Sequence, residues 1–234
     1  MISLTYTYIL IIVLLIFLPL KGFAKKRIKS RMLSSFYSIC LEYSILFILL
    51  YLSLTEFDFN FIQFFHIQFA DAFEIIIEVS LSVILILGLD LFSLSLLLKK
   101  NIYNLEQKET TFSRNTAFSD NHLLNKVYII IFCILSGTWE EVIFRGILFY
   151  LFDFFGISIF FTILFSSIIF SLFHFTNGVN QMLYSFFYGL IFALIYAFTD
   201  SLIAVVIAHI TGNMFVLLVS IPIWKKKRRR NIFF

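Results

Sequence analysis

Three short motifs in the second half of the chain carry the residue types that hydrolysis at a carbonyl group needs. They contain two glutamates, two histidines and an asparagine, namely Glu140, Glu141, His174, His209 and Asn213. A carboxylate can take a proton from water, and a histidine can orient that water or act as an acid. An amide can donate a hydrogen bond to the oxyanion that develops at the attacked carbonyl. These residues are therefore candidates for one hydrolytic site.

Helical spacing divides the roles within the first motif. Glu141 and Arg145 are four positions apart in acid-before-base order, which favours an ion pair on one helix face. Glu140 is rotated by about 100° from Glu141, so we expect its carboxylate to be left for chemistry. A charge near the middle of a bilayer costs roughly 2.5–3.5 kcal/mol, so these side chains should face a protein interior.

The other two motifs each place a histidine one helical turn from a partner. Phe170 and His174 are four positions apart, as are His209 and Asn213. Residues at this spacing share a helix face. The second pair would set an acid–base group beside an amide donor.

The composition indicates that membrane-spanning helices must position these motifs. The chain of 234 residues is 61% hydrophobic and only 14% charged, which is typical of a polytopic membrane protein. We predict an all-α transmembrane bundle of about seven spans. The expected spans cover residues 3–20, 34–54, 75–98, 127–150, 155–175, 181–198 and 200–223.

The distribution of charge predicts the orientation of the spans. Basic residues gather at 21–31, 99–100 and 225–230, whereas segment 56–74 has acids and no Lys or Arg. The positive-inside rule then places the N-terminus outside and the C-terminus in the cytoplasm, in the cell membrane. We expect the basic tail to anchor this topology and to attract anionic lipid rather than nucleic acid.

We predict three parts along the chain. Residues 1–126 form a three-span part with a cytoplasmic loop, 127–224 a four-span core, and 225–234 the basic tail. The third span contains Glu78 and Asp90, which we expect to face the helix bundle, with a proton relay as the alternative.

The predicted span limits set Glu140 and His174 at different depths. Glu140 lies about 20 Å of helix from the cytoplasmic end, whereas His174 lies beside that end. Three arrangements would resolve this difference: a fourth helix broken near Gly137, a fifth helix that extends beyond residue 175, or helices that tilt around a cytoplasm-facing cavity. We favour a break or re-entry near Gly137, because irregular backbone is tolerated where it lines a cavity.

The motifs together resemble the CPBP family of intramembrane proteases, also called the Abi family. These motifs are Glu-Glu-x-x-x-Arg at 140–145, Phe-x-x-x-His at 170–174 and His-x-x-x-Asn at 209–213, in that order on successive predicted spans. The family includes CAAX prenyl endopeptidases and bacteriocin-processing enzymes. Gly189, midway between the histidine motifs, agrees with the family pattern, and the resemblance covers about residues 127–220.

The resemblance implies a role for each matching residue. Glu140 would be the general base for water, and His174 and His209 would hold that water or a metal. Asn213 would be the oxyanion donor. Supporting residues would be Glu141, Arg145 and Phe170. Two mechanisms stay open: Glu140, His174 and His209 would hold zinc, or Glu140 and His174 would activate water without a metal.

The expected function is therefore intramembrane hydrolysis of a peptide or membrane-protein substrate. One alternative is a non-catalytic membrane binding protein of the same fold, such as a bacteriocin self-immunity factor. Another is a proton-coupled transporter that uses Glu78, Asp90 and the buried motif. A transporter would favour halves related by a repeat, which the sequence does not show. The sequence carries no signal for oligomeric state or for prenylation of the substrate.

Overall fold

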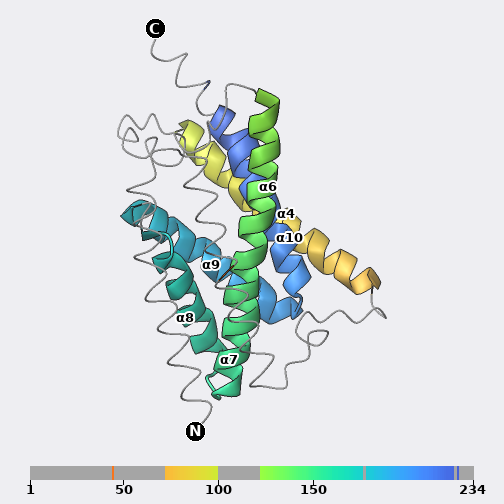
Figure 1. The fold of residues 1–234 in the computed structure, drawn as a ribbon, viewed down its shortest axis with the longest axis vertical. Coiled ribbons are helices and arrows are strands. Elements are labelled where there is room, and N and C mark those ends of the chain that lie inside the picture. The colour runs from red at the N-terminus through yellow and green to blue at the C-terminus, as the bar shows by residue number, and fades with distance from the viewer. Residues whose placement is uncertain (1–43, 45–71, 100–121, 176–177, 224–225, 227–234) are drawn as a thin grey trace. The chain divides into compact units, whose positions relative to one another are not determined.

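The computed structural model describes residues 44, 72–99, 122–175, 178–223 and 226, all of whose regular elements are helices (Figure 1). The elements are α4 (Ala72–Lys99), α6 (His122–Glu141), the π-helical segment η3 (Val142–Ile147), α7 (Leu148–Phe154), α8 (Ile159–Leu172), α9 (Val179–Thr199), α10 (Leu202–Phe215) and the π-helical segment η5 (Val216–Ser220). The predicted all-α class is confirmed for this part of the chain.

Four of the helical stretches are long and apolar enough to cross a bilayer. They are Phe73–Leu96, Leu123–Phe154, Val179–Thr199 and Leu202–Ile223. These match the predicted third, fourth, sixth and seventh spans, and they indicate an integral membrane protein. The predicted fifth span is a helix of only 14 residues, Ile159–Leu172. The predicted spans 3–20 and 34–54 lie outside the described residues, so the count of seven stays a prediction.

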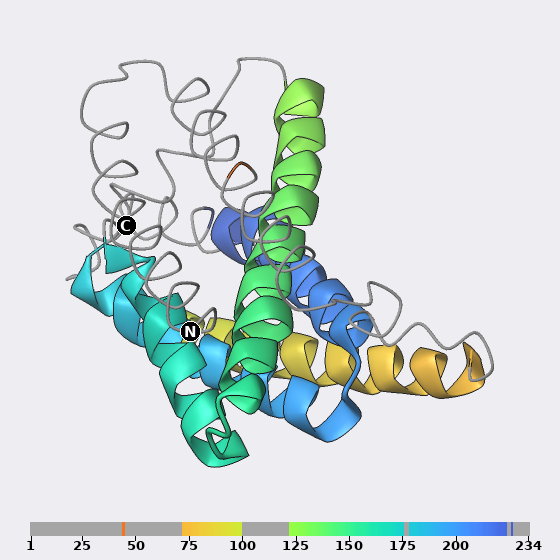
Figure 2. The same ribbon diagram turned by 60° about the horizontal axis from the view of Figure 1, so that its bottom comes forward.

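The predicted break near Gly137 is wrong. Helix α6 is regular through Gly137 and continues through η3 into α7 without interruption (Figures 1 and 2). A Cβ added at Gly137 would lie 2.8 Å from Ile210 Cγ1 and 3.3 Å from the Ile210 backbone nitrogen. The glycine therefore permits close helix packing. The irregular backbone comes after the acidic pair, at η3.

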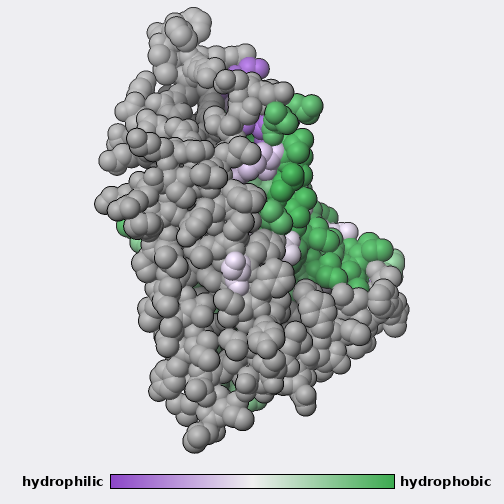
Figure 3. Space-filling view, viewed as in Figure 1, coloured by the Kyte–Doolittle hydropathy of each residue, from purple (hydrophilic) through white to green (hydrophobic). Residues whose placement is uncertain are grey.

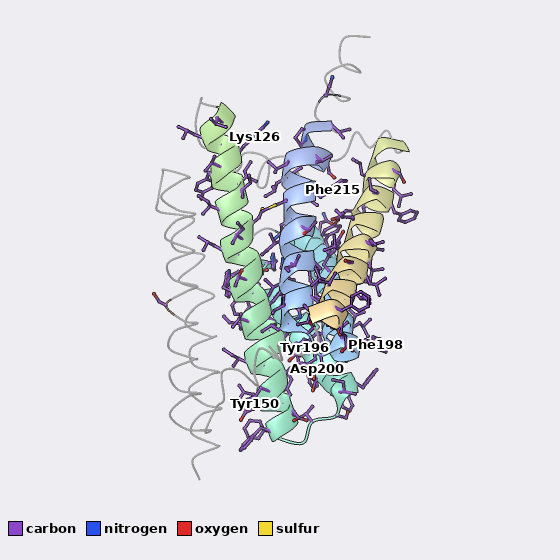
Figure 4. All side chains as sticks on the ribbon, turned by 90° about the vertical axis from the view of Figure 1, so that its right-hand side faces the viewer. Lys126, Tyr150, Tyr196, Phe198, Asp200 and Phe215 are labelled. Carbon is purple, nitrogen blue, oxygen red and sulfur yellow. The ribbon has the colours of Figure 1, made fainter. Side chains whose placement is uncertain are left out.

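The described residues form two compact units, and the first contains residues 139–202. In this unit α8 packs along α9 and also contacts η3 and α7. Ser171 Oγ donates a 2.7 Å hydrogen bond to Met182 O, which ties the end of α8 to α9. Helix α9 ends at Thr199 and is capped by Asp200, which adopts the left-handed conformation (φ 53°) that Asp tolerates and donates its N–H to Tyr196 O at 2.7 Å. Figure 4 shows Tyr196 and Asp200 at this helix end.

The second unit contains α4, most of α6 and most of α10. Helix α10 lies between α6 and α4 (Figure 4), contacting α6 at Gly137 and α4 at Gly212. An apolar cluster of Ile129, Cys133 and Leu217 packs α6 against the helical stretch that follows α10. In a membrane the hydrophobic effect does not drive helices together, so close packing of this kind between small residues and apolar side chains holds them.

The outer faces of the helices carry large apolar side chains. On α4 these include Phe73, Leu81 and Ile84, each more than 60% exposed. Figure 3 shows hydrophobic residues gathered along the visible side of α6 and α4. Apolar surface of this extent is compatible with lipid rather than with water.

Candidate functional site

A fully buried ion pair lies at the centre of the unit formed by residues 139–202. Arg145 Nη1 lies 3.0 Å from Glu141 Oε1 and 2.9 Å from Oε2, and both side chains are 0% exposed. Arg145 Nη2 also donates a 2.6 Å hydrogen bond to Gly189 O on α9. The ion pair predicted from the four-residue spacing is present. It also links the first motif to α9.

Three phenylalanine rings surround the guanidinium group of Arg145. Its Cζ atom lies 4.9 Å from the ring centroid of Phe170, 5.7 Å from that of Phe192 and 6.0 Å from that of Phe144. An aromatic face attracts a cation, and the attraction grows when water is excluded. The rings therefore help to offset the cost of burying Arg145.

Glu140 differs from its neighbour in environment. Glu141 is fully buried in the ion pair, whereas Glu140 is only half-buried. The two residues are consecutive in α6, so their side chains leave the helix about 100° apart. The two carboxylates therefore lie in different environments, and their separate roles in a site stay a prediction.

His174 lies in the turn that follows α8, and its ring is held by the backbone. Its Nδ1 lies 3.0 Å from Phe170 O, and its backbone N–H donates a 2.9 Å bond to Ser171 O. A carbonyl oxygen can only accept, so Nδ1 carries the proton in the neutral ring. The tautomer with the lone pair on Nε2 is thereby favoured.

Ring contacts bring the start of the first motif to the level of the second. Trp139 and Phe173 have ring centroids 6.5 Å apart, and Phe144 contacts Phe173 edge-on at 5.3 Å. Trp139 directly precedes Glu140, and Phe173 directly precedes His174. Glu140 and His174 therefore each come directly after one of two aromatic residues whose rings contact each other.

The helix hairpin explains why the predicted difference in depth does not arise. Glu140 is 14 positions before the last residue of α7, and His174 is 15 positions after the first residue of α8. At about 1.5 Å per residue, each lies about 21–23 Å of helix from the same turn. The predicted limits at this turn, 150 and 155, were each four residues too early, which placed Glu140 too near the turn and His174 too far from it.

The third motif lies on α10, in the other unit. His209 is 5% exposed and Asn213 is half-buried, and the two are one helical turn apart as expected. Glu140 and His174 belong to one compact unit, whereas His209 and Asn213 belong to the other. The predicted meeting of the two groups stays a prediction.

The geometry can be compared at this point with known proteins. Residues 122–215 match the family of type II CAAX prenyl endopeptidases, Rce1-like. The resemblance inferred from the three motifs is confirmed by this match. It begins at the first residue of α6 and ends at the last residue of α10, so α4 lies outside this Rce1-like segment. No curated protein and no solved structure matches the chain.

The residue types of the three motifs include those of a zinc ligand set, but the described residues do not bring three of them together. One carboxylate and two imidazoles are a common ligand set for catalytic zinc, and a metal-bound histidine usually has its second ring nitrogen bonded to an acceptor. His174 has such an acceptor in Phe170 O. Among the described residues, no three His, Cys, Asp or Glu side chains form a group that can hold one metal ion.

Sequence reasoning missed several supporting residues of the Rce1-like segment. Two of them, Phe144 and Phe192, pack around Arg145, and the third, Trp139, directly precedes Glu140. Aromatic residues are so common in this chain, with 33 phenylalanines, that their presence in the sequence marks no site. No local pattern separates them from lipid-facing rings. Gly189 was noted as part of the family pattern, and its carbonyl as a partner of Arg145 was not expected.

We expect Gly189→Ala to destabilise the Rce1-like segment. The new Cβ would lie 2.9 Å from Phe170 Cδ1 and 3.5 Å from Ser167 Cα. The Phe170 ring is held between Phe144 and Arg145, so it has little room to move. Overpacking of this kind costs about 1–3 kcal/mol, which a lower midpoint of thermal unfolding in detergent micelles would show.

Gly88→Ala is the matched control for this variant. A Cβ added at Gly88 meets nothing within 4 Å, and alanine favours helix over glycine by about 1 kcal/mol. The midpoint should stay constant or rise. Equal midpoints for Gly189→Ala and the unaltered protein would contradict the close packing at Phe170.

Proposed function

We propose that the protein is an intramembrane endopeptidase that hydrolyses a peptide bond of a membrane-associated protein or peptide. The match of residues 122–215 to type II CAAX prenyl endopeptidases carries this proposal. The geometry adds support, because a half-buried glutamate follows Trp139 at the level of a histidine whose tautomer is held by the backbone. Nearby, the buried ion pair keeps the surrounding helices in place.

In the proposed reaction Glu140 takes a proton from a water molecule whose oxygen attacks the peptide carbonyl carbon. The lone pair on His174 Nε2 accepts a hydrogen bond from the same water and orients it. The carbonyl oxygen becomes an oxyanion, which the Asn213 amide stabilises by donating a hydrogen bond. When the tetrahedral intermediate collapses, the C–N bond breaks and the proton on Glu140 passes to the leaving amine.

The supporting residues would act by holding the base in place. Glu141 neutralises Arg145, and Arg145 in turn fixes the end of α6 to α9 through Gly189 O. Phe170 packs on the guanidinium and lies 5.0 Å, centroid to centroid, from the His174 ring. These contacts limit the motion of Glu140 and His174, and small displacements of catalytic groups are costly.

A metal is part of the proposal in one of its two forms. In that form Glu140, His174 and His209 would hold zinc, and the ion would polarise the water and the carbonyl. If zinc is required, protein purified from cells grown with a chelator should be inactive, and one equivalent of Zn²⁺ should restore cleavage. If elemental analysis finds no metal in protein that is fully active, the zinc-dependent form is excluded and the metal-free form is retained.

The membrane setting of the proposed enzyme follows from its charges. We propose a multi-pass protein of the cell membrane with its N-terminus outside and its C-terminus in the cytoplasm, its partners being lipid and a peptide substrate rather than nucleic acid. Attachment of a reporter to either terminus, followed by protease protection in sealed vesicles, tests this orientation. Protection of the N-terminal rather than the C-terminal reporter in inside-out vesicles supports it.

Comparative peptidomics tests the function in the cell. Membranes that contain the native protein should yield peptides that are absent from membranes with Glu140→Gln. Loss of those cleavage products supports the enzyme. If the peptides are identical and the cellular phenotype persists in the variant, the protein acts by binding, as a self-immunity factor of this fold would.

A further inference from the structure

A buried acid lies on α4, outside the Rce1-like segment. Asp90 is 2% exposed, within the apolar stretch Phe73–Leu96. An ionisable residue at such a position is costly and normally faces the protein interior. The expectation that Asp90 faces other helices is confirmed, and neither the three motifs nor the family match assigns it a role.

Asp90 faces the turn of α10 that carries the third motif. A Cβ added at Gly212 would lie 3.3 Å from Asp90 Oδ2 and 2.7 Å from Ile86 Cγ2. Gly212 therefore leaves the space that the carboxylate occupies, and α4 and α10 touch here (Figure 4). His209 and Asn213 belong to the same turn, three positions before Gly212 and one after it.

The side chains near this turn favour His209 as the hydrogen-bond partner of Asp90. Among the described residues of this unit, the buried polar side chains are Ser82, Asp90, Ser136 and His209. Residues three positions apart on a helix have Cβ atoms about 5–6 Å apart, which is within reach of a carboxylate seated on Gly212. A carboxylate that is buried away from water needs a hydrogen-bond donor, and an imidazole N–H supplies one, whereas an apolar side chain does not.

We propose that Asp90 is a positioning residue for His209. Its carboxylate accepts a hydrogen bond from one imidazole N–H, so that the other ring nitrogen carries the lone pair and faces the substrate. His174 is held in the same manner by Phe170 O, so each histidine has an acceptor that selects its tautomer. This inference rests on the proposed function, and it extends the catalytic machinery to a helix upstream of the Rce1-like segment.

Nitrogen NMR of the histidine rings tests the contact without any measurement of activity. The full chain contains four histidines, so ¹⁵N-histidine labelling in lipid nanodiscs gives few signals, which single His→Gln variants assign. In Asp90→Asn the ¹⁵N signals of His209 should change to those of a different tautomer, while those of His174 stay in place. Unchanged His209 signals in folded Asp90→Asn protein would overturn the proposal.

Two further variants keep the test decisive if Asp90→Asn does not fold. Gly212→Ala retains the carboxylate but fills its space, so it should alter the His209 signals as well. Ser82→Ala removes a different buried polar group from the same helix and should leave them unchanged. Equal changes in Ser82→Ala and Gly212→Ala would show a general loss of packing and would reject a specific contact.

Kinetics then relate the contact to catalysis. Residues that orient a histidine typically contribute 10–100-fold, so Asp90→Asn should lower kcat by about that factor with little change in KM. Asp90→Glu should recover part of the loss. If the native protein cleaves no peptide, the proposed function fails while the NMR result still decides the role of Asp90.

Discussion

Replacement of Glu140 by glutamine should lower kcat for peptide cleavage by about 10²–10⁴-fold in protein reconstituted in lipid vesicles. This range is the usual contribution of a general base. Glutamine has the shape of glutamate but cannot take a proton from water. KM should change much less than kcat, because the base acts in the transition state rather than in substrate binding. The measurement is a steady-state cleavage assay with a fluorogenic peptide.

Glu74→Gln is the matched control, since it makes the same chemical change at an exposed glutamate in the first turn of α4. Its activity should equal that of the native protein. A Glu140→Gln protein that retains more than half of the native kcat would show that another group activates the water.

Replacement of Arg145 by leucine should give the largest loss of stability in the described part of the chain. The change leaves the carboxylate of Glu141 buried without its cation, and breaking a buried pair in this way costs about 3–5 kcal/mol. The hydrogen bond to Gly189 O is also lost. Unfolding by SDS in mixed micelles measures the change, as a lower midpoint and a lower free energy of unfolding.

The double variant Glu141→Leu with Arg145→Leu separates the charge from the packing. It removes both ions, so only the hydrogen bond to Gly189 O, worth about 0.5–1.5 kcal/mol, is left without its donor. The double variant should therefore be more stable than Arg145→Leu alone. If the single and double variants lose equal stability, the aromatic contacts of the guanidinium, rather than the ion pair, stabilise this region.

Local spacing was sufficient to predict the pairs along each helix. Glu141 with Arg145, Phe170 with His174 and His209 with Asn213 are all four positions apart, and each pair lies together because the helical period fixes it. The spans from residue 72 onward followed from continuous apolar runs. These properties depend on near neighbours in the chain, which is why the sequence alone predicts them.

Contacts between helices were harder to predict. A break or re-entry was predicted near Gly137 to resolve the difference in depth, but the helix is regular there and the small glycine lets Ile210 approach closely. The rings around Arg145 come from three different elements, and the sequence contains no signal that sets Phe192 apart from rings that face lipid. Depth was mispredicted because the expected turn between α7 and α8 was placed about four residues too early in the chain. Such features are set by packing partners far away in sequence.

The π-helical segment η3 determines which way the side chains of α7 point around the helix axis. A wider turn accommodates one residue more than an α-helical turn, so it rotates everything downstream by about 100° relative to an uninterrupted α-helix. Val142–Ile147 are all buried, so this offset occurs inside the protein rather than at its lipid surface. The side of α7 that meets α8 is therefore offset from the one that an uninterrupted α-helical repeat would present. An alignment that keeps one helical repeat across both would assign the wrong faces to the residues beyond Arg145.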